Sequence, residues 1–331
     1  MQAPAFWWNP KPAPLARLLQ PAALLYAGAA AFRAGVTPSR RGGVPVICIG
    51  NPTVGGAGKT PTAIAVAAML SGAGRRPVFL TRGYGGRLKG PVLVEVDRHA
   101  SCDVGDEPLL LARHGPVIVS GNRVAGAKIA RQHGDVIVMD DGFQNPSLAK
   151  DFSLLVIDGH VGVGNGLCLP AGPLRMGAAR QFAAADAVLI VGEDETHLAG
   201  QLPDSVLRLA GVIGGEPPAA LAGRTLVAFS GIGRPSKFFA TLEGAGLHVA
   251  TRIAFPDHHV FTESEASALL DHAAREKAVL VSTEKDCVRL TAGGDTPLAR
   301  LARQTVPYPV TMQFDVPSAR ALESRLAAII G

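Results

Sequence analysis

Residues 44–70 read VPVICIGNPTVGGAGKTPTAIAVAAML, and this stretch decides the fold. Its first seven residues are a short apolar run that predicts a buried strand, and residues 60–70 predict a helix. The glycine-rich turn GNPTVGGAGKTP (50–61) joins the two. Strand, glycine loop and helix in this order are typical of an α/β fold in which the loop binds phosphate at the end of a parallel sheet.

The core of the turn, GGAGKT (55–60), has the residue types that phosphate binding requires. Glycines allow backbone N–H groups to close on phosphate oxygens. Lys59 is expected to reach the β- and γ-phosphates of ATP, and the Thr60 hydroxyl to hold Mg²⁺. The strict pattern G-x-x-x-x-G-K-[ST] places a glycine where this chain has Thr53. A flexible glycine loop ending in a surface lysine is therefore the alternative. The predicted nucleotide-binding residues are Thr53, Gly55, Gly56, Ala57, Gly58, Lys59 and Thr60.

Short apolar runs alternate with helical stretches along the rest of the first two thirds of the chain. Such strands joined by helices indicate a parallel sheet covered on both faces, here of the P-loop NTPase type. A helix is predicted at 122–134. Further strands are predicted at 76–82, 116–120, 135–141, 152–158 and 186–192.

After about residue 200 a Gly- and Pro-containing stretch interrupts the pattern, which then resumes. We therefore predict three parts: an N-terminal amphipathic helix (1–40), a P-loop core (41–200) and a second, smaller α/β lobe (201–331). The elements predicted for this lobe are strands at 224–233, 247–255 and 278–286 and helices at 235–245 and 262–276.

Two aspartates follow the apolar run 136–139 in the sequence VIVMDDGFQ (136–144). In a parallel sheet the carboxyl end of this strand faces the same crevice as the phosphate loop. Asp140 and Asp141 are therefore predicted, with Thr60, to hold Mg²⁺ directly or through water. The alternative is a pair of turn aspartates before Gly142.

The first 41 residues hold both tryptophans, Trp7 and Trp8, and the apolar stretch 15–35. An interfacial helix is the favoured interpretation, because aromatic side chains lie at headgroup level and arginines face anionic phosphates. An ordinary packed helix is one alternative, and a spanning or signal segment is another. The uncharged part is shorter than the ~20 residues that a spanning helix needs. The arginines of this region are Arg17, Arg33, Arg40 and Arg41.

The composition narrows the class of partner. The 331 residues are 47% hydrophobic and 18% charged, with a formal net charge of +5. A mild positive balance suits acidic partners, but only 5% of residues are aromatic and no basic run is interleaved with them, so we expect no nucleic-acid partner. The four cysteines have neither paired nor zinc-type spacing and are predicted to be free thiols.

Seven motifs follow one another along the chain. They are GNPTVGGAGKTP (50–61), TRGYGG (81–86), VGDEPLLLA (104–112), DDGFQ (140–144), LPAGPLR (169–175), FPDHH (255–259) and STEKDCVRL (282–290). Through these motifs in this order, the chain resembles the tetraacyldisaccharide 4′-kinase family of lipid A biosynthesis over nearly its whole length.

The resemblance implies a lipid kinase that uses ATP and Mg²⁺. It would transfer the γ-phosphate to the 4′-hydroxyl of a tetraacyldisaccharide 1-phosphate, giving lipid IVA. It also implies association with the cytoplasmic face of the bacterial inner membrane, and no obligate protein partner is evident. Asp106 resembles the family's catalytic aspartate and His258 its histidine partner. A carboxylate takes the proton of the acceptor hydroxyl, and the histidine orients that carboxylate or relays the proton.

Several alternatives stay open. His259 is the rival of His258, and Asp106 taken alone suits a helix N-cap. The family pattern has His and Glu where this chain has Asn145 and Met176, so no role is predicted for these two residues.

A membrane-tethered ATPase that switches a protein partner is the second hypothesis for the function. The signature lysine of that class is absent, because Val54 occupies its position. A nucleotide-binding scaffold without turnover is the third hypothesis. Arg82, Arg123 and Arg175 are candidate ligands for the phosphates of ATP or of the lipid, with a solvated surface role as the alternative.

Overall fold

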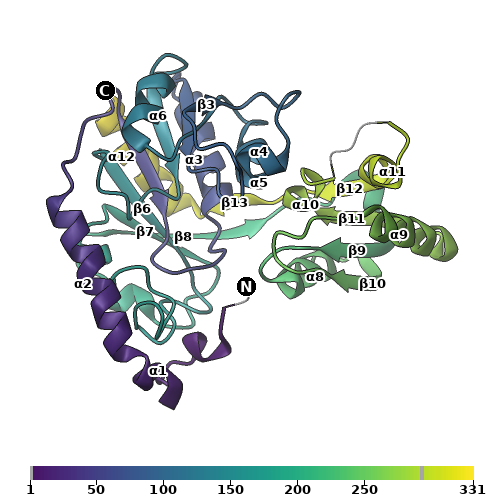
Figure 1. Ribbon diagram of the computed structural model, residues 1–331, viewed down its shortest axis with the longest axis horizontal. Coiled ribbons are helices and arrows are strands. Elements are labelled where there is room, and N and C mark those ends of the chain that lie inside the picture. The colour runs from purple at the N-terminus through teal and green to yellow at the C-terminus, as the bar shows by residue number, and fades with distance from the viewer. Residues whose placement is uncertain (1–2, 291–293) are drawn as a thin grey trace.

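The computed structural model describes residues 3–290 and 294–331. In these residues the strands form a nine-stranded sheet and a four-stranded sheet. We call the first sheet with its helices the large lobe and the second the small lobe (Figure 1). The 3₁₀ turns of the chain are η1 (Ala5–Trp8), η2 (Leu198–Gln201) and η3 (Ala219–Leu221).

The sheet of the large lobe has the order β13-β8-β7-β6-β1-β5-β2-β4-β3. Neighbouring strands pair in parallel except at the two edges, where β13 and β3 are antiparallel to their partners. Every residue of β1, β2, β5, β6 and β7 is buried, because helices cover both faces. The strands are β1 (Val46–Gly50), β2 (Pro77–Thr81), β3 (Val92–Leu93), β4 (Val117–Val119), β5 (Val136–Asp140), β6 (Phe152–Asp158), β7 (Ala187–Val191), β8 (Leu207–Gly214) and β13 (Thr311–Phe314).

Two helices of the large lobe, at 59–72 and 123–130, correspond to the helices predicted at 60–70 and 122–134. The helix after the glycine loop is α3, and it packs one buried face on the sheet core. The helices are α3 (Lys59–Gly72), α4 (Ser101–Val104), α5 (Asp106–Leu111), α6 (Arg123–Ala130), α7 (Ala178–Ala183) and α12 (Val316–Ile330).

The small lobe has a sheet of order β10-β9-β11-β12, in which all paired strands are parallel. Apolar side chains fill both faces of this sheet, around Phe239 on one and Phe261 on the other. Its elements are β9 (Thr225–Ser230), α8 (Pro235–Gly244), β10 (His248–Ala254), α9 (Glu263–Glu276), β11 (Val279–Thr283), α10 (Glu284–Cys287), α11 (Pro297–Gln304) and β12 (Thr305–Tyr308).

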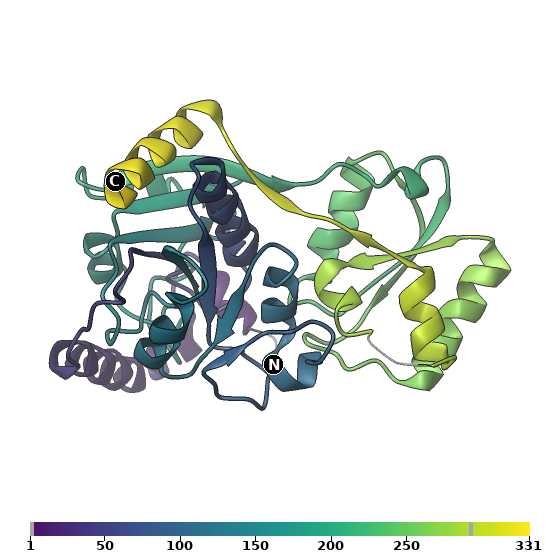
Figure 2. The same ribbon diagram turned by 90° about the horizontal axis from the view of Figure 1, so that it is seen from above.

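The prediction that residues 201–331 form the second lobe needs a correction. Both β8 and β13 belong to the large sheet, where Thr311 pairs with Gly214. The last helix, α12, then lies over the large lobe beside α3 (Figure 2). The small lobe is thus an excursion of the chain between two adjacent strands. Sequence pattern missed this because β8 is only alternately buried and β13 has four residues.

The N-terminal region forms α1 (Pro14–Leu18) and α2 (Gln20–Val36), which run along the outer edge of the large lobe (Figure 1). The apolar residues of α2 divide by size. Small side chains at 23, 27, 30 and 34 follow helical spacing and are buried or partly buried. Leu25, Phe32 and Val36 share the opposite face and are 78%, 72% and 58% exposed. In the described part of the chain, no helix is both long and apolar enough to cross a membrane.

Candidate active site

The phosphate loop leaves β1 at Gly50 and ends where α3 begins at Lys59. Gly58 precedes the helix with φ of 95°, and a Cβ there would lie 2.4 Å from the Ile213 side chain, so only glycine fits. Above Gly55 and Gly56 the space is open, because a Cβ at either position meets no atom within 4 Å. Glycine backbone facing open space at a helix N-terminus is the arrangement that accepts phosphate.

Lys59 points from this loop toward the carboxylates of the neighbouring strand. Its Nζ lies 3.4 Å from Asn51 Oδ1 and 3.9 Å from Asp141 Oδ1, and the side chain is 11% exposed. Thr53 is buried and forms a bridge with Leu174, so the LPAGPLR segment (169–175) supports the loop from one side.

Thr60 and Asp140 come together as predicted. The Thr60 hydroxyl donates to Asp140 Oδ2 at 3.2 Å, and both residues are buried. Burial raises the pKa of Asp140 to about 7, and the negative charge of Glu107 adds to this effect. Its Oδ1 is also buried, and no hydrogen-bond donor in the described residues reaches it.

These features fit Mg²⁺, because an unpaired carboxylate oxygen beside a hydroxyl supplies the oxygen ligands that this ion prefers. No group of three or more His, Cys, Asp or Glu side chains that could hold a metal occurs in the part of the chain that is described. The predicted set, two carboxylates and one hydroxyl, would leave the remaining ligand positions to phosphate oxygens and water.

Asp141 follows Asp140, the last residue of β5, and has partners of its own. It has φ of 54°, which is uncommon outside glycine, and its Oδ1 accepts a hydrogen bond from Arg175 Nη1 at 2.9 Å. Gln144 donates to the carbonyl of Asn51 at 2.8 Å. The DDGFQ motif (140–144) is therefore bonded both to the phosphate loop and to the GPLR segment (172–175).

Asp106 and His258 are brought together across the two lobes, 152 residues apart in sequence. Asp106 Oδ2 lies 2.9 Å from His258 Nδ1, whereas the Nε2 atom of His259 binds Glu265 at 3.0 Å. His259 also stacks on Phe255, and neither of these contacts involves Asp106. The structure thus separates the two histidines, which the sequence alone left open.

Asp106 does not cap its helix. It is the first residue of α5, and the preceding Gly105 takes the N-cap position with φ of 92°. A Cβ at Gly105 would lie 2.4 Å from the carbonyl oxygen of Tyr84. The TRGYGG segment (81–86) and the GDEP segment (105–108) therefore approach through glycine backbone, which frees the Asp106 carboxylate to face the small lobe.

The carboxyl of Asp106 is ionised at neutral pH. Burial raises its pKa, but hydrogen bonds from His258 and Arg289 together outweigh burial and hold the pKa below the ordinary value. The same hydrogen bond to Asp106 raises the pKa of His258. His258 has φ of 57°, and uncommon backbone of this kind clusters at functional sites.

Three charged residues at this junction were not predicted, although all lie in quoted motifs. Arg289 binds Asp106, and Lys285 Nζ lies 2.6 Å from Glu107 Oε1. The charge of Lys285 lowers the pKa of Glu107 to about 2, although burial of the carboxyl acts in the opposite direction. The charge of these residues was the sequence signal that they form ion pairs. No sequence pattern reveals that Lys285 pairs with Glu107, 178 positions away, or Arg289 with Asp106, 183 positions away.

Known proteins are similar to this chain over nearly its whole length. The profile of the tetraacyldisaccharide-1-P 4′-kinase family matches residues 15–330. This chain belongs to that family. The predicted family is thereby confirmed. A tetraacyldisaccharide 4′-kinase of Bradyrhizobium sp. (strain ORS 278) is 49% identical over 337 residues, covering 98% of both chains. One of Methylorubrum extorquens is 50% identical over 310 residues, covering 91% of this chain and 93% of the relative.

A solved structure extends the likeness to three dimensions. LpxK from Aquifex aeolicus, crystallised in complex with ATP, superposes with a TM-score of 0.76 at 26% identity. The match covers 96% of this chain and 100% of that one, so both lobes are included. The predicted α/β class with a P-loop NTPase-type sheet is confirmed for this family member.

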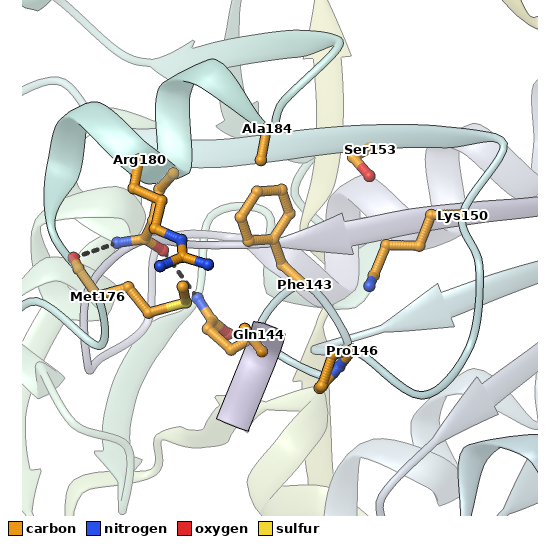
Figure 3. A pocket seen from close by; sticks show the side chains of 10 residues that line it. Phe143, Gln144, Pro146, Lys150, Ser153, Met176, Arg180 and Ala184 are labelled. Carbon is orange, nitrogen blue, oxygen red and sulfur yellow. Dashed lines mark hydrogen bonds between the residues drawn. The ribbon is translucent and has the colours of Figure 1, made fainter. Parts of the chain in front are cut away.

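A pocket of about 200 Å³ adjoins the site of this tetraacyldisaccharide-1-P 4′-kinase family member (Figure 3). It lies between Ala34 near the end of α2, Phe143 and Gln144 of the DDGFQ motif, and α7. Met176, one of the two residues that depart from the family pattern, lines it. Asn145, the other, accepts hydrogen bonds from the backbone and the hydroxyl of Ser147 in the segment that follows the DDGFQ motif.

Arg82, Arg123 and Arg175 have different surroundings. Arg82 is exposed, and Arg175 binds Asp141. Arg123 is 3% exposed, donates to the carbonyl of Ser120, and has a buried Nε without a partner in the described residues. Burial lowers the pKa of Arg123.

Proposed function

We propose that this protein transfers the γ-phosphate of ATP to the 4′-hydroxyl of a tetraacylated disaccharide 1-phosphate in lipid A biosynthesis. The observation that carries the proposal is the Asp106–His258 pair held at 2.9 Å across the lobes, in a chain that matches this kinase family from residue 15 to 330. A protein that only hydrolyses ATP or only binds it has no need of a base for an acceptor hydroxyl.

The proposed chemistry uses the two lobes together. The acceptor hydroxyl loses its proton to Asp106, its oxygen forms a bond to the γ-phosphorus, and the bond from that phosphorus to ADP breaks. His258 and Arg289 both contact Oδ2 of Asp106. Neither occupies Oδ1, which we assign to the hydroxyl. The open backbone of Gly55 and Gly56 and the side chain of Lys59 are proposed to bind the phosphates of ATP.

Thr60, Asp140 and Asp141 are the residues proposed to hold Mg²⁺. When bound, the ion neutralises charge that develops on the transferred phosphate. Asp140 is positioned for this by its hydrogen bond from Thr60, and Asp141 by Arg175.

Membrane association is proposed for the exposed apolar face of α2. Leu25, Phe32 and Val36 point away from the protein, although burying such side chains is the usual outcome in a folded domain. A lipid surface is the occupant that suits an apolar stripe with arginines at both ends of the region. The pocket between α2 and the DDGFQ motif then lies on the path from the membrane to the phosphate loop. We place the protein on the cytoplasmic face of the inner membrane, where ATP is available.

The test is transfer of labelled phosphate from radioactive ATP to tetraacyldisaccharide 1-phosphate in detergent micelles, resolved by thin-layer chromatography. The wild type is expected to give a labelled lipid, and Lys59→Ala and Asp106→Ala are expected to lose it. Lys128→Ala is the matched control, because this lysine lies in the last turn of α6. ATP hydrolysis without a labelled lipid would refute the proposal and favour the ATPase that switches a protein partner.

A further inference from the structure

We propose that Arg289 is a positioning residue that acts through Asp106: it orients the Asp106 carboxylate so that Oδ1 faces the acceptor hydroxyl. This inference rests on the proposed function. Arg289 lies two residues after the end of α10 in the small lobe, and Asp106 begins α5 in the large lobe. Its guanidinium is therefore an inter-lobe contact.

Two nitrogens of the Arg289 guanidinium bind one oxygen of Asp106. Arg289 Nε and Nη2 lie 2.7 and 2.6 Å from Asp106 Oδ2. His258 Nδ1 reaches the same oxygen at 2.9 Å. Three charged or polar hydrogen-bonding atoms on a single carboxylate oxygen define the plane and the direction of the carboxylate. Oδ1, on the other side of the group, is then presented at a defined place.

Arg289 is itself held rigidly. Its side chain is 5% exposed, and Nη1 donates to Asp286 Oδ1 and to the carbonyl of Gly231, at 2.9 and 2.8 Å. Asp286 is fully buried and accepts hydrogen bonds from the hydroxyls of Ser230 and Thr283. An exposed arginine would sample several rotamers and have no single orientation. Arg289 keeps one orientation because Asp286 and Gly231 bind its Nη1.

The same anchor aligns His258. The carbonyl of Gly231 accepts both Arg289 Nη1 and the backbone N–H of His258, the latter at 3.0 Å. The positions of Arg289 and His258 are thus fixed by hydrogen bonds to the same peptide group. Both therefore contact Asp106 from one place in the small lobe, and lysine in place of Arg289 cannot reproduce the fork of donors.

Other charges face this group from the surrounding elements. Lys285 of α10 faces both Glu107 and Asp106, and Lys59 of α3 faces Glu107. Asp257 Oδ1 lies 4.0 Å from His258 Nε2. These charges remain when Arg289 is changed, so the pH dependence of the rate is compared between variants that differ only at Arg289.

The experiment is a double-mutant cycle on phosphate transfer to the lipid, with Arg289→Met, Asp106→Asn and the double variant. Arg289→Met is expected to lower kcat roughly 30-fold with the KM for ATP changed less than about threefold, because misplacing a reacting group costs rate more than binding. In the Asp106→Asn background the same change is expected to lower kcat less than about threefold, because the residue through which Arg289 acts is already lost. Arg289→Lys is expected to restore part of kcat.

Two readouts separate positioning from general stability. Arg252→Met removes an arginine of the same lobe whose Nε and Nη2 both contact one oxygen of Glu243, and it is expected to leave kcat unchanged. The acid limb of the pH–rate profile is expected to move to higher pH in Arg289→Met, since a hydrogen bond that lowers the pKa of Asp106 is gone. Rates are normalised to the folded fraction, measured by thermal unfolding of each variant.

Equal losses of kcat from Arg289→Met in both backgrounds, an unmoved acid limb, or wild-type activity in Arg289→Met would overturn the proposal. These results are distinguishable from failure of the proposed function. A wild type that makes no labelled lipid refutes the kinase assignment and the Arg289 proposal with it, whereas an active wild type with additive variants refutes the Arg289 proposal alone.

Discussion

The exposed apolar face of α2 allows us to predict how much affinity for a membrane is lost when its large side chains are replaced. We choose Leu25→Gln together with Phe32→Gln. Both side chains lie on the face opposite the buried Ala23. Glutamine is a good helix former, so the change removes apolar surface without breaking the helix.

The expected loss follows from how much of each side chain is free to enter the lipid. Full burial of a leucine or phenylalanine side chain is worth roughly 1.5–3 kcal/mol. Because the two side chains are 78% and 72% exposed in the protein, each contributes about 1.5 kcal/mol and the pair about 3 kcal/mol. At about 1.4 kcal/mol per tenfold, vesicle affinity is expected to fall roughly 100-fold.

The assay is co-flotation with vesicles of neutral and anionic lipid across a range of lipid concentrations. Val96→Gln with Val316→Gln is the matched control, because these valines are 56% and 62% exposed but lie outside α2. The control is expected to bind like the wild type. Binding that remains in the α2 variant is expected to depend on salt, since arginines near an anionic surface contribute about 1 kcal/mol each.

Two results would refute the reasoning. Wild-type vesicle affinity in the α2 variant would mean that this face is not the membrane contact. An equal loss in the control would mean that affinity follows total apolar surface and not the placement of Leu25 and Phe32. A thermal unfolding scan of the variant checks that α2 still packs on the large lobe.

Three further predictions concern the site. First, His258→Gln is expected to lower kcat roughly 100-fold and His259→Gln less than about threefold, because only His258 contacts Asp106; similar losses in steady-state rate assays would contradict this. Second, Asp140→Asn is expected to abolish transfer but to raise Tm in metal-free buffer, and more at pH 8 than at pH 5. Burial raises the pKa of Asp140 to about 7, so the wild-type carboxylate is neutral at pH 5 and bears an unfavourable buried charge at pH 8. A lower Tm at pH 8 would count against it. Third, Lys285→Met is expected to lower the free energy of unfolding by about 2 kcal/mol at pH 7 in urea titrations, because Glu107 loses its partner. The pKa of Glu107 is lowered to about 2, so this contribution is present above the ordinary value of 4.5 and is lost as pH falls through 2. A difference from wild type that persists unchanged at pH 2 would refute the ion-pair explanation.

Local pattern alone was enough to predict most of the large sheet and the helix after the glycine loop. Buried parallel strands are continuous apolar runs, and this signal is present in residues 46–50 and 136–140 without any knowledge of their neighbours. The small lobe was predicted as an α/β unit for the same reason. Its limits were not, because Thr311 returns to pair with Gly214 and such long-range pairing has no local signature.

The sequence by itself therefore determined the glycine loop and the strand–helix order, since these follow from residue type and spacing, and the resemblance to the kinase family indicated Asp106 and His258. Only the tertiary structure decided that His258 and not His259 meets Asp106, that Arg289 completes the contact, and that the large side chains of α2 face outward. The reason is geometric. Adjacent residues such as His258 and His259 have the same chemistry, and the backbone turns them toward different partners: Asp106, 152 residues away, for His258 and the nearby Glu265 for His259.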